Sequence, residues 1–379
     1  MKILMISNCF PSRLKPRHGV FVLRLSKELN KSGNNIIVLA PKIFAGEPFL
    51  ERIDGIKVYR FMYPSGNKTL GQSPGIPVFT MLIYMISGIL SALRIVSKER
   101  PDIIHGHWIV PTGLIASITG LITGIPVVNT ARGMDVRISN TLPIIDWLFK
   151  LAVKLSRVSV VVSPAMRHKN ELKDAEIIPS GVDEMFFNIK PRRTKDLIIY
   201  TRSLEPIYDV ETLIKSIPVI RDKAPGARFI IAGSGSQLGY LKDLAKKLGI
   251  RDSIDFLGEV ENREIARLAQ EASIFVSTAR ADGTSIALLE AMAAGLIPVV
   301  TDIDANRAWL EHDKDGFLFR PGDEYDLARN IVKALEKDLD MDILENKARE
   351  IKSIASWQTI SERYIDIYKS IATNKKDKK

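Results

Sequence analysis

Strand-like and helix-like segments alternate along this chain, and the alternation restarts halfway. In the first half, short apolar runs such as 3–7 and 35–41 are each followed by a polar or glycine-bearing segment, and residues 20–29 have helical periodicity. Such βα alternation predicts an α/β fold, in which helices cover a parallel sheet. A polar, basic, proline-bearing stretch at 186–196 then precedes a second half with the same rhythm.

Two domains are expected, because 379 residues are too many for one comfortable hydrophobic core. We predict an N-terminal Rossmann-like domain over 1–187 and a C-terminal Rossmann-like domain over 188–355. An amphipathic helix should follow at 356–372, and a disordered basic tail at 373–379. Two doubly wound domains that face each other form a cleft, and ligands of parallel sheets bind at the carboxyl ends of the strands. The cleft is therefore the expected active site.

The net charge of +10 belongs entirely to the first half of the chain. Residues 1–187 contain 23 Lys and Arg against 13 Asp and Glu, whereas residues 188–379 contain 31 of each kind. A basic half can face nucleic acid, anionic lipid or a phosphorylated substrate, and an ordinary solubilising surface has the same composition. No basic-aromatic platform or helix-turn-helix pattern is present, so we expect no binding to nucleic acid.

Residues 69–93 contain no charged side chain, and from Ile76 the run is nearly continuous apolar. Its length approaches that of a bilayer span, but serine, threonine and glycine dilute it. We expect a buried or membrane-facing helix at 76–95. Together with the basic charge, this favours peripheral contact between the first domain and an anionic membrane. The alternative is an ordinary buried helix of that domain.

The first residues, MKILMISN, predict a strand and lack the features of a signal peptide. The expected location is therefore the cytoplasm, with the inner face of the cell membrane as the alternative. Cys9 is the single cysteine, so no internal disulfide is expected.

Polar residues follow the strand-like runs of the second half, where each strand should end. Arg202 follows LIIYT, the turn at 233–235 follows FIIA, Val260 closes the loop after IDFL, and Asp282 follows SIFVSTARA. In a parallel sheet these ends share one edge, so we expect the loops to lie together.

The stretch ADGTSIALLEAMAAG, residues 281–295, places two carboxylates in an otherwise small and apolar segment. Gly283 permits close approach of a ligand, and Thr284 or Ser285 can cap the helix that follows. The helix start forms an anion site. Glu290 lies roughly 8–10 Å further along the axis, at about 1.5 Å per residue.

This spacing matches the three parts of a nucleotide sugar. The sugar would lie at Asp282, the diphosphate at 283–285 and the ribose at Glu290, whose carboxylate accepts hydrogen bonds from two hydroxyls. The alternative is a buried glutamate paired with a structural arginine or lysine.

The same stretch, read as D-G-T-S-I-A-L-L-E-A-M-A-A-G-L-I-P-V-V, resembles the signature of family 4 retaining glycosyltransferases. That signature usually reads E-G-F-G-x-x-x-x-E-A-M-A-x-G-x-P-V-V, so the first acid here is Asp in place of Glu. Further motifs occur in family order, and the resemblance covers nearly the whole chain. They are DIIHGHW (102–108), PVVNTARGMD (126–135), IIPSGVD (177–183), the AGSG turn, FLGEV (256–260), DKDGFLFRPGD (313–323) and a final helix opening with Ser356-Trp357.

The resemblance implies the two-domain GT-B fold, with the C-terminal helix crossing back to the first domain. It implies a retaining, hexosyltransferase-type glycosyltransferase of polysaccharide biosynthesis. The donor would be an NDP-sugar acting as co-substrate, and the acceptor a glycan, a lipid-linked molecule or a small molecule. No cofactor and no metal are implied, and Asp302-Ile303-Asp304 is interpreted as a loop start rather than a metal site. The alternative is a catalytically inactive subunit that only binds a sugar nucleotide.

By resemblance, Glu290 binds the donor ribose, Asp282 contacts the donor sugar and Arg202 neutralises the departing diphosphate. Without the family, Arg202 would be an ordinary surface residue at a strand end. The remaining donor-binding residues implied are Gly19, Tyr208, Gly233, Gly235, Val260, Gly283, Thr284 and Ser285.

Two positions depart from the family pattern. Where the family usually has K-G-V, this chain has Tyr208-Asp209-Val210, so the diphosphate loses a cation unless Arg280 or Arg307 replaces it. Tyr208 can still donate one hydrogen bond.

The second departure is Arg132, which stands where many relatives have the histidine of T-x-H-G-x-D. Arg132 stays protonated, so its candidate catalytic role is to bind a charged sugar or a phosphate rather than to act as a base. The alternative is a salt bridge to Asp135. His107 and Asp135 are candidates for acceptor contact; a histidine at this strand end, like His105, is more often a satisfied structural residue.

Retention requires a carboxylate nucleophile or a front-face reaction assisted by the leaving phosphate. In the first half Asp135 is the one candidate carboxylate, and the family favours the front-face route.

Overall fold

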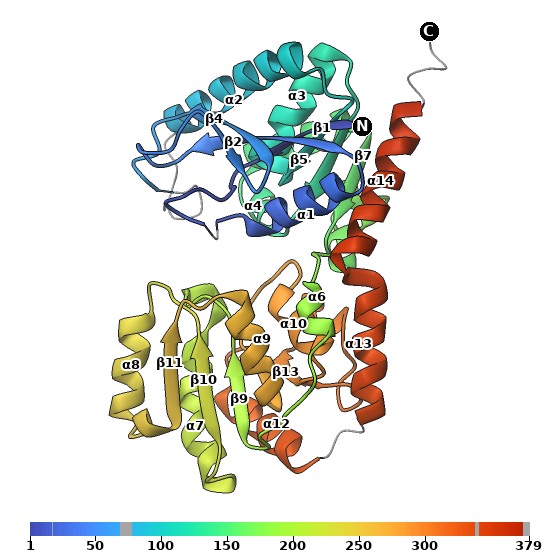
Figure 1. The fold of residues 1–379 in the computed structure, drawn as a ribbon. Coiled ribbons are helices and arrows are strands. Elements are labelled where there is room, and N and C mark those ends of the chain that lie inside the picture. Colours follow the sequence, from blue (N-terminus) through green and yellow to red (C-terminus); the bar gives the residue numbers. More distant parts are fainter. Residues whose placement is uncertain (17, 69–77, 338–340, 374–379) are drawn as a thin grey trace. The chain divides into compact units, whose positions relative to one another are not determined.

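The computed structural model describes residues 1–16, 18–68, 78–337 and 341–373 (Figure 1). The chain divides into two compact units, one of residues 1–181 and 357–379 and the other of residues 182–356. Each unit is an α/β layer structure built on its own, almost entirely parallel sheet. The GT-B class predicted from the sequence is confirmed.

The first unit has an eight-stranded sheet with the order β3-β4-β2-β1-β5-β6-β7-β8, in which β3 alone is antiparallel to its neighbour. Its strands are β1 (Lys2–Ser7), β2 (Asn35–Lys42), β3 (Leu50–Ile53), β4 (Ile56–Met62), β5 (Ile103–His107), β6 (Val127–Ala131), β7 (Val158–Val161) and β8 (Glu176–Ile177). Its helices are α1 (Val20–Lys31), α2 (Val78–Glu99), α3 (Leu114–Thr123), α4 (Met134–Ser139), α5 (Pro143–Leu155) and α14 (Trp357–Thr373).

Alternation of side chains along the buried strands divides the helices of this unit into two layers. Ile3 and Met5 of β1 pack in the core with α1 and α14, whereas Leu4 and Ile6 pack with α2 and α3. Figure 1 shows α1 and α2 on opposite faces of the sheet. The C-terminal helix α14 therefore belongs to the first unit, as the resemblance implied.

The second unit has a six-stranded parallel sheet with the order β11-β10-β9-β12-β13-β14. Its strands are β9 (Leu197–Tyr200), β10 (Arg228–Ala232), β11 (Ile254–Gly258), β12 (Ile274–Ser277), β13 (Ile297–Thr301) and β14 (Phe317–Phe319). Its helices are α6 (Glu184–Phe187), α7 (Val210–Lys223), α8 (Leu238–Lys247), α9 (Asn262–Glu271), α10 (Ile286–Ala293), α11 (Asp304–Arg307), α12 (Glu324–Glu336) and α13 (Met341–Ala355).

The structure moves the first domain boundary from 187 to Gly181–Val182. The physical reason is packing: Val182 and Phe186 lie buried in the same core cluster as α10. The second boundary, between Ser356 and Trp357, falls a single residue from the position expected. The predicted tail lies outside the described residues from 374 onward.

The charge-free stretch forms α2 from Val78 onward, while residues 69–77 lie outside the described part of the chain. Tyr84, Gly88, Ala92 and Ile95 are its buried residues. Several large apolar side chains elsewhere on α2 are exposed, so this helix is buried on one side and not all round. In length and composition α2 is also compatible with a membrane span.

Candidate functional site

Parallel strands bring the predicted donor-binding residues to one edge of the second sheet. Arg202 follows β9, the glycine turn follows β10, Val260 follows β11, and Asp282 lies in the loop between β12 and α10. β10, β9, β12 and β13 are paired in parallel, so these loops leave the sheet on the same side. The loops are therefore neighbours, as the order of strands predicted.

Arg202 is the centre of this group. Its guanidinium forms an ion pair with Asp282 at 2.5 Å and lies 3.2 Å from the Ser285 hydroxyl and 3.3 Å from the Ser277 hydroxyl. The guanidinium also stacks on the Tyr208 ring, 4.4 Å from its centroid. Burial acts to lower the pKa of Arg202, but the Asp282 carboxylate and Tyr208 outweigh it, and the pKa lies above its usual value. A permanently charged, oriented cation results.

The N-terminus of α10 begins beside this cation. Ser285 is the N-cap, and its side chain accepts a hydrogen bond from the Leu288 amide at 3.2 Å. Asp282 accepts a hydrogen bond from the Gly283 amide at 2.8 Å, and Gly283 and Thr284 are buried in the same turn. A helix N-terminus carries partial positive charge, so helix and arginine together form a site for an anion.

Glu290 lies within α10 and is 9% exposed. The Asn262 side-chain amide lies 3.5 Å from the Glu290 carboxylate and 3.2 Å from that of Asp183. Glu290 is therefore next to an amide that α9 supplies, five residues along α10 from the N-cap Ser285. Asn262 was not predicted as a site residue, because nothing in its local sequence reveals a contact 28 positions away.

The segment in place of the family K-G-V motif is held in a left-handed turn. Asp209 has a φ of 47°, a conformation that favours glycine and that aspartate tolerates. Its carboxylate accepts a hydrogen bond from Thr212 and pairs with Arg280 at 2.9 Å. Arg307 pairs with Asp302 at 2.6 Å and with Asp304 at 3.1 Å. Both candidate replacement cations thus already have carboxylate partners.

Close packing against the loop after β9 explains why the turn after β10 contains glycine at two positions. An added Cβ at Gly233 would overlap the carbonyl oxygen of Arg202, and one at Gly235 would overlap that of Leu204. Both glycines therefore let the loops after β9 and β10 pack directly on each other. Val260 is half-buried against the core beside α9 and α10.

In the first unit, Arg132 follows β6 and is half-buried. Its guanidinium lies 4.0 Å from the Phe21 ring centroid and donates to the Ser180 hydroxyl at 3.1 Å. Among the described residues its Nε has no hydrogen-bond partner. Burial lowers the pKa of Arg132, which remains strongly basic. This side chain can accept an anionic ligand.

Asp135 binds backbone amides. One carboxylate oxygen accepts from Ile109 at 2.7 Å, and the other accepts from the backbone amides of Arg132 at 3.0 Å and Gly133 at 2.9 Å. Burial raises the pKa of Asp135 despite these amides. The carboxylate therefore holds the turn that presents Arg132.

The two histidines of β5 differ. His105 is hydrogen-bonded to the hydroxyls of Tyr368 at 2.7 Å and Thr130 at 2.8 Å, and burial lowers its pKa to about 3. His107 is completely buried, and its ring lies tilted against that of His105, with 4.2 Å between the ring centroids. Neither of its ring nitrogens has a hydrogen-bond partner among the described residues, and burial holds its pKa well below the usual value. In this unit His107 is enclosed, so no surface contact with an acceptor is available to it.

Gly19 ends the loop after β1 and begins α1 with a φ of 75°. An added Cβ there would lie 2.6 Å from the Cys9 carbonyl oxygen. Gly19 is therefore required by the loop's own geometry, whatever it contributes to a ligand.

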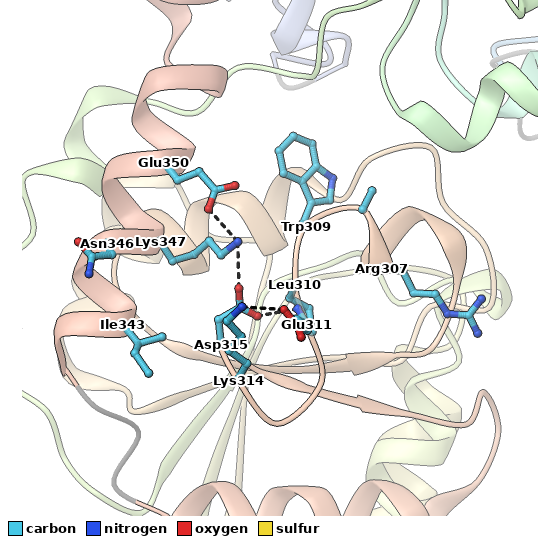
Figure 2. Close-up of a pocket in the computed structure, with 11 residues that line it drawn as sticks. Arg307, Trp309, Leu310, Glu311, Lys314, Asp315, Ile343, Asn346, Lys347 and Glu350 are labelled. Carbon is cyan, nitrogen blue, oxygen red and sulfur yellow. Dashed lines mark hydrogen bonds and ion pairs between the residues drawn. The ribbon is translucent and has the colours of Figure 1, made fainter.

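A separate pocket of about 620 Å³ lies between α13 and the segment after β13, and Figure 2 shows the charges that line it. Lys347 pairs with Asp315 and Glu350, each at 2.9 Å. These charges satisfy one another and tie α13 to the sheet. In the part of the chain that the structure describes, no three His, Cys, Asp or Glu side chains are grouped to hold a metal ion.

Comparison with known proteins gives a consistent set of similarities. The model of a family described as Glycosyl transferases group 1 matches residues 182–351, and that of Glycosyltransferase Family 4 matches residues 18–185. An uncharacterized glycosyltransferase of Methanocaldococcus jannaschii is 24% identical over 396 residues, covering 97% of this chain and 98% of that protein. N-acetyl-alpha-D-glucosaminyl L-malate synthase of Bacillus anthracis is 23% identical over 388 residues, covering 98% and 97%.

Among solved structures, HepE of Anabaena in complex with UDP and glucose superposes with a TM-score of 0.72. The two chains are 18% identical, and the match covers 98% of this chain and 100% of HepE. This likeness concerns the fold.

The buried histidines predict a loss of stability in acid. Unfolded histidine titrates near 6.5, whereas His105 titrates at about 3 and His107 well below its usual value in the folded chain. Below pH 6.5 the unfolded state therefore binds more protons than the folded state. The free energy of unfolding is not reduced by these histidines above pH 6.5, and it falls as the pH decreases from 6.5 toward 3.

In His105→Gln, the slope of unfolding free energy against pH in this window should decrease by about 1.4 kcal/mol per pH unit. Urea unfolding at a series of pH values measures this slope. The exposed His168→Gln is the matched control for the loss of one histidine. An unchanged slope in His105→Gln would contradict the assignment.

Proposed function

This chain belongs to the group 1, family 4-type glycosyltransferases, and from that premise we propose that it transfers a sugar from a nucleoside diphosphate sugar with retention of configuration. The proposed acceptor is a glycan, a lipid-linked molecule or a small molecule. The proposed location is the cytoplasm.

The observation that carries the proposal is the position of Arg202 at the start of α10. Its guanidinium lies 3.2 Å from the N-cap hydroxyl of Ser285. A cation and a helix N-terminus that converge on one point favour a diphosphate over a single carboxylate, because both parts then contribute to binding. Negative charge grows on the diphosphate as the sugar leaves, so this arrangement stabilises the transition state more than the ground state.

Glu290 and Asp282 would hold the two ends of the donor. Glu290 lies about 7.5 Å along the helix from Ser285 at 1.5 Å per residue, a suitable reach for the ribose that follows a diphosphate. Its carboxylate would accept hydrogen bonds from two ribose hydroxyls. Asp282 would accept from a hydroxyl of the donor sugar while it keeps Arg202 charged and oriented.

In the proposed reaction, the bond between the anomeric carbon and the diphosphate oxygen breaks. The acceptor hydroxyl attacks the same face, and its proton passes to the departing diphosphate. Asp135 supports this front-face route over a covalent intermediate, because both of its oxygens are engaged with backbone amides. Arg132, whose Nε has no partner in the part of the chain that the structure describes, would bind an anionic group of the sugar or acceptor.

The proposal needs no metal, because Arg202 and the helix N-terminus supply the positive charge that the diphosphate requires. Transfer should therefore persist after exhaustive treatment with EDTA. A product assay on the chelated enzyme measures this, and activity that returns only with added divalent cation would contradict it.

A catalytically inactive, sugar-nucleotide-binding subunit is the competing function, and the Tyr208 and Arg132 departures are its basis. Release of nucleoside diphosphate from a panel of UDP-, GDP- and ADP-sugars separates the two. Turnover of one donor supports the transferase, whereas saturable binding without turnover supports the inactive subunit.

Arg202→Ala should lower kcat several hundredfold, because removing one donor to a developing oxyanion costs about 3–4 kcal/mol. Arg280→Ala is the matched control: its guanidinium pairs with Asp209 and should matter little. Steady-state kinetics with the accepted donor measures both. Near-parent turnover in Arg202→Ala would show that Arg202 does not stabilise the departing diphosphate.

Glu290→Gln should weaken binding of the free nucleoside diphosphate about tenfold, because an amide is the poorer acceptor for two hydroxyls. Asp282→Asn should retain that affinity and lose transfer. The exposed Glu336→Gln serves as the control. Calorimetric titration with the nucleotide measures the affinity of each variant. Loss of nucleotide binding in Asp282→Asn would show that the ribose and sugar ends of the donor are assigned to the wrong residues.

A further inference from the structure

The outward side of α2 carries large apolar side chains. Leu82, Ile86 and Leu90 recur every four residues and are 53%, 50% and 62% exposed. Tyr84 and Gly88 lie on the opposite side, in the core of the first unit. A surface helix normally places polar residues outward, so this stripe is unusual.

Positively charged side chains follow the apolar stripe toward the C-terminal end of α2. Arg94 and Lys98 follow at the same four-residue spacing, and both are exposed. A groove of about 380 Å³ lies along this side of α2. It is lined by Ile83, Ile86, Ser87, Leu90, Ser91 and Arg94. The helix therefore changes from apolar, through hydroxyl groups, to cationic along one line.

Neighbouring helices of the same layer extend the apolar surface. α2 packs on α3, α3 on α5, and α5 on α4. Leu121 and Ile122 of α3 are 67% and 60% exposed, and Ile144 and Trp147 of α5 are 61% and 58% exposed. We call these residues, with Leu82, Ile86 and Leu90, the outer apolar face.

We propose that the outer apolar face docks on an anionic phospholipid bilayer. Its apolar side chains enter the acyl boundary, while Arg94 and Lys98 meet the phosphates. Charge complementarity favours this occupant, because residues 1–187 hold the whole net charge of +10. Exposed Trp147 fits the interface, where an amphipathic ring is stable. The docking proposal is argued from the exposed side chains and their charge and does not depend on the proposed function. Only the use of this surface to reach a lipid-linked acceptor rests on the proposed function.

The helix docks in the plane of the membrane and does not cross it. Tyr84, Gly88, Ala92 and Ile95 are buried in the unit. An added Cβ at Gly88 would lie 2.5 Å from the Ile115 side chain of α3, so the two helices are closely packed. Crossing a bilayer would require α2 to leave this core, whereas docking uses the side that is already exposed.

The test is flotation of the full-length protein with vesicles of phosphatidylcholine, alone or mixed equally with phosphatidylglycerol. Binding is expected to the mixed vesicles at low salt, with little to phosphatidylcholine. It should weaken at high salt, because the screening length falls from about 10 Å at 0.1 M to about 3 Å at 1 M. No binding to the mixed vesicles at low salt overturns the proposal.

Two variants separate the contributions. Arg94→Gln with Lys98→Gln should weaken binding roughly 30-fold, from about 1 kcal/mol for each charge near the leaflet. Leu82→Gln, Ile86→Gln and Leu90→Gln together should abolish it. All five side chains are exposed, so the melting temperature and nucleotide affinity should stay at the parent values. Parent-like vesicle binding in both variants overturns the proposal.

The matched control lies on α8 and the residue after it, in the second unit. Leu248→Gln with Lys246→Gln and Lys247→Gln removes one exposed apolar side chain and two exposed cations. Vesicle binding should be unchanged. A loss as large as that of the α2 variants would show that the face is not specific.

Trp147 supplies an independent readout. The fluorescence of the parent should shift to shorter wavelength on mixed vesicles, and Trp147→Phe should remove the shift. Sedimentation velocity tests the competing occupant: a stable dimer that the triple α2 variant dissociates would assign the face to a second copy and overturn the proposal. Vesicle binding of the parent that does not weaken at high salt would also overturn it, in favour of insertion.

Failure of this proposal is distinguishable from failure of the proposed function. Donor hydrolysis in solution needs no membrane, so the α2 variants should retain it. Vesicle binding without any donor turnover would leave the docking surface in place and reject the transferase.

Discussion

Parallel pairing of strands is the constraint on which the donor site depends. β9 and β12 are direct neighbours that run the same way, so residues far apart in the chain leave the sheet at the same edge. Arg202 and Ser285 are 83 positions apart and still lie 3.2 Å from each other. The ion pair with Asp282 then offsets the cost of burying the guanidinium. The sheet, the pair and the cap of α10 together hold a cation at a helix N-terminus.

The two units use polar groups differently. In the second unit, the central arginine is paired with Asp282 and lies beside the N-cap residue of α10. In the first unit, polar side chains behind β5 and β6 largely satisfy one another. His105 joins β5 to α14 through Tyr368, 263 positions away, and Asp135 fixes the turn before α4. Arg132 and His107 are exceptions, because the Nε of Arg132 and both ring nitrogens of His107 lack a partner among the described residues.

Local patterns were sufficient to predict the fold and the position of α10. The βα rhythm is a short-range signal, and so is the cap at Ser285, which the structure confirms. The pairing of Asp209 with Arg280, and that of Asp302 with Arg307, could not be predicted, because each depends on side-chain directions that only the folded loops define. The same applies to Asn262 beside Glu290.

For α2, the sequence could predict burial of one face of the helix but not whether the other face is covered. The charge-free sequence of α2 did not distinguish a helix enclosed on all sides from one with an exposed apolar stripe, because both have the same composition. The boundary at 187 moved for a similar reason: Phe186 looks like part of a linker in the sequence and packs in the core of the second unit.

The central claim is that a nucleoside diphosphate binds between Arg202 and the start of α10. Amide hydrogen exchange of the full chain, read by mass spectrometry with saturating UDP, GDP or ADP, tests it most directly. One nucleotide should slow exchange at residues 283–288 and in the loop after β9, because bound ligand restrains local opening. Protection confined to the pocket around Trp309 and Lys347, or none with any nucleotide, would contradict the claim.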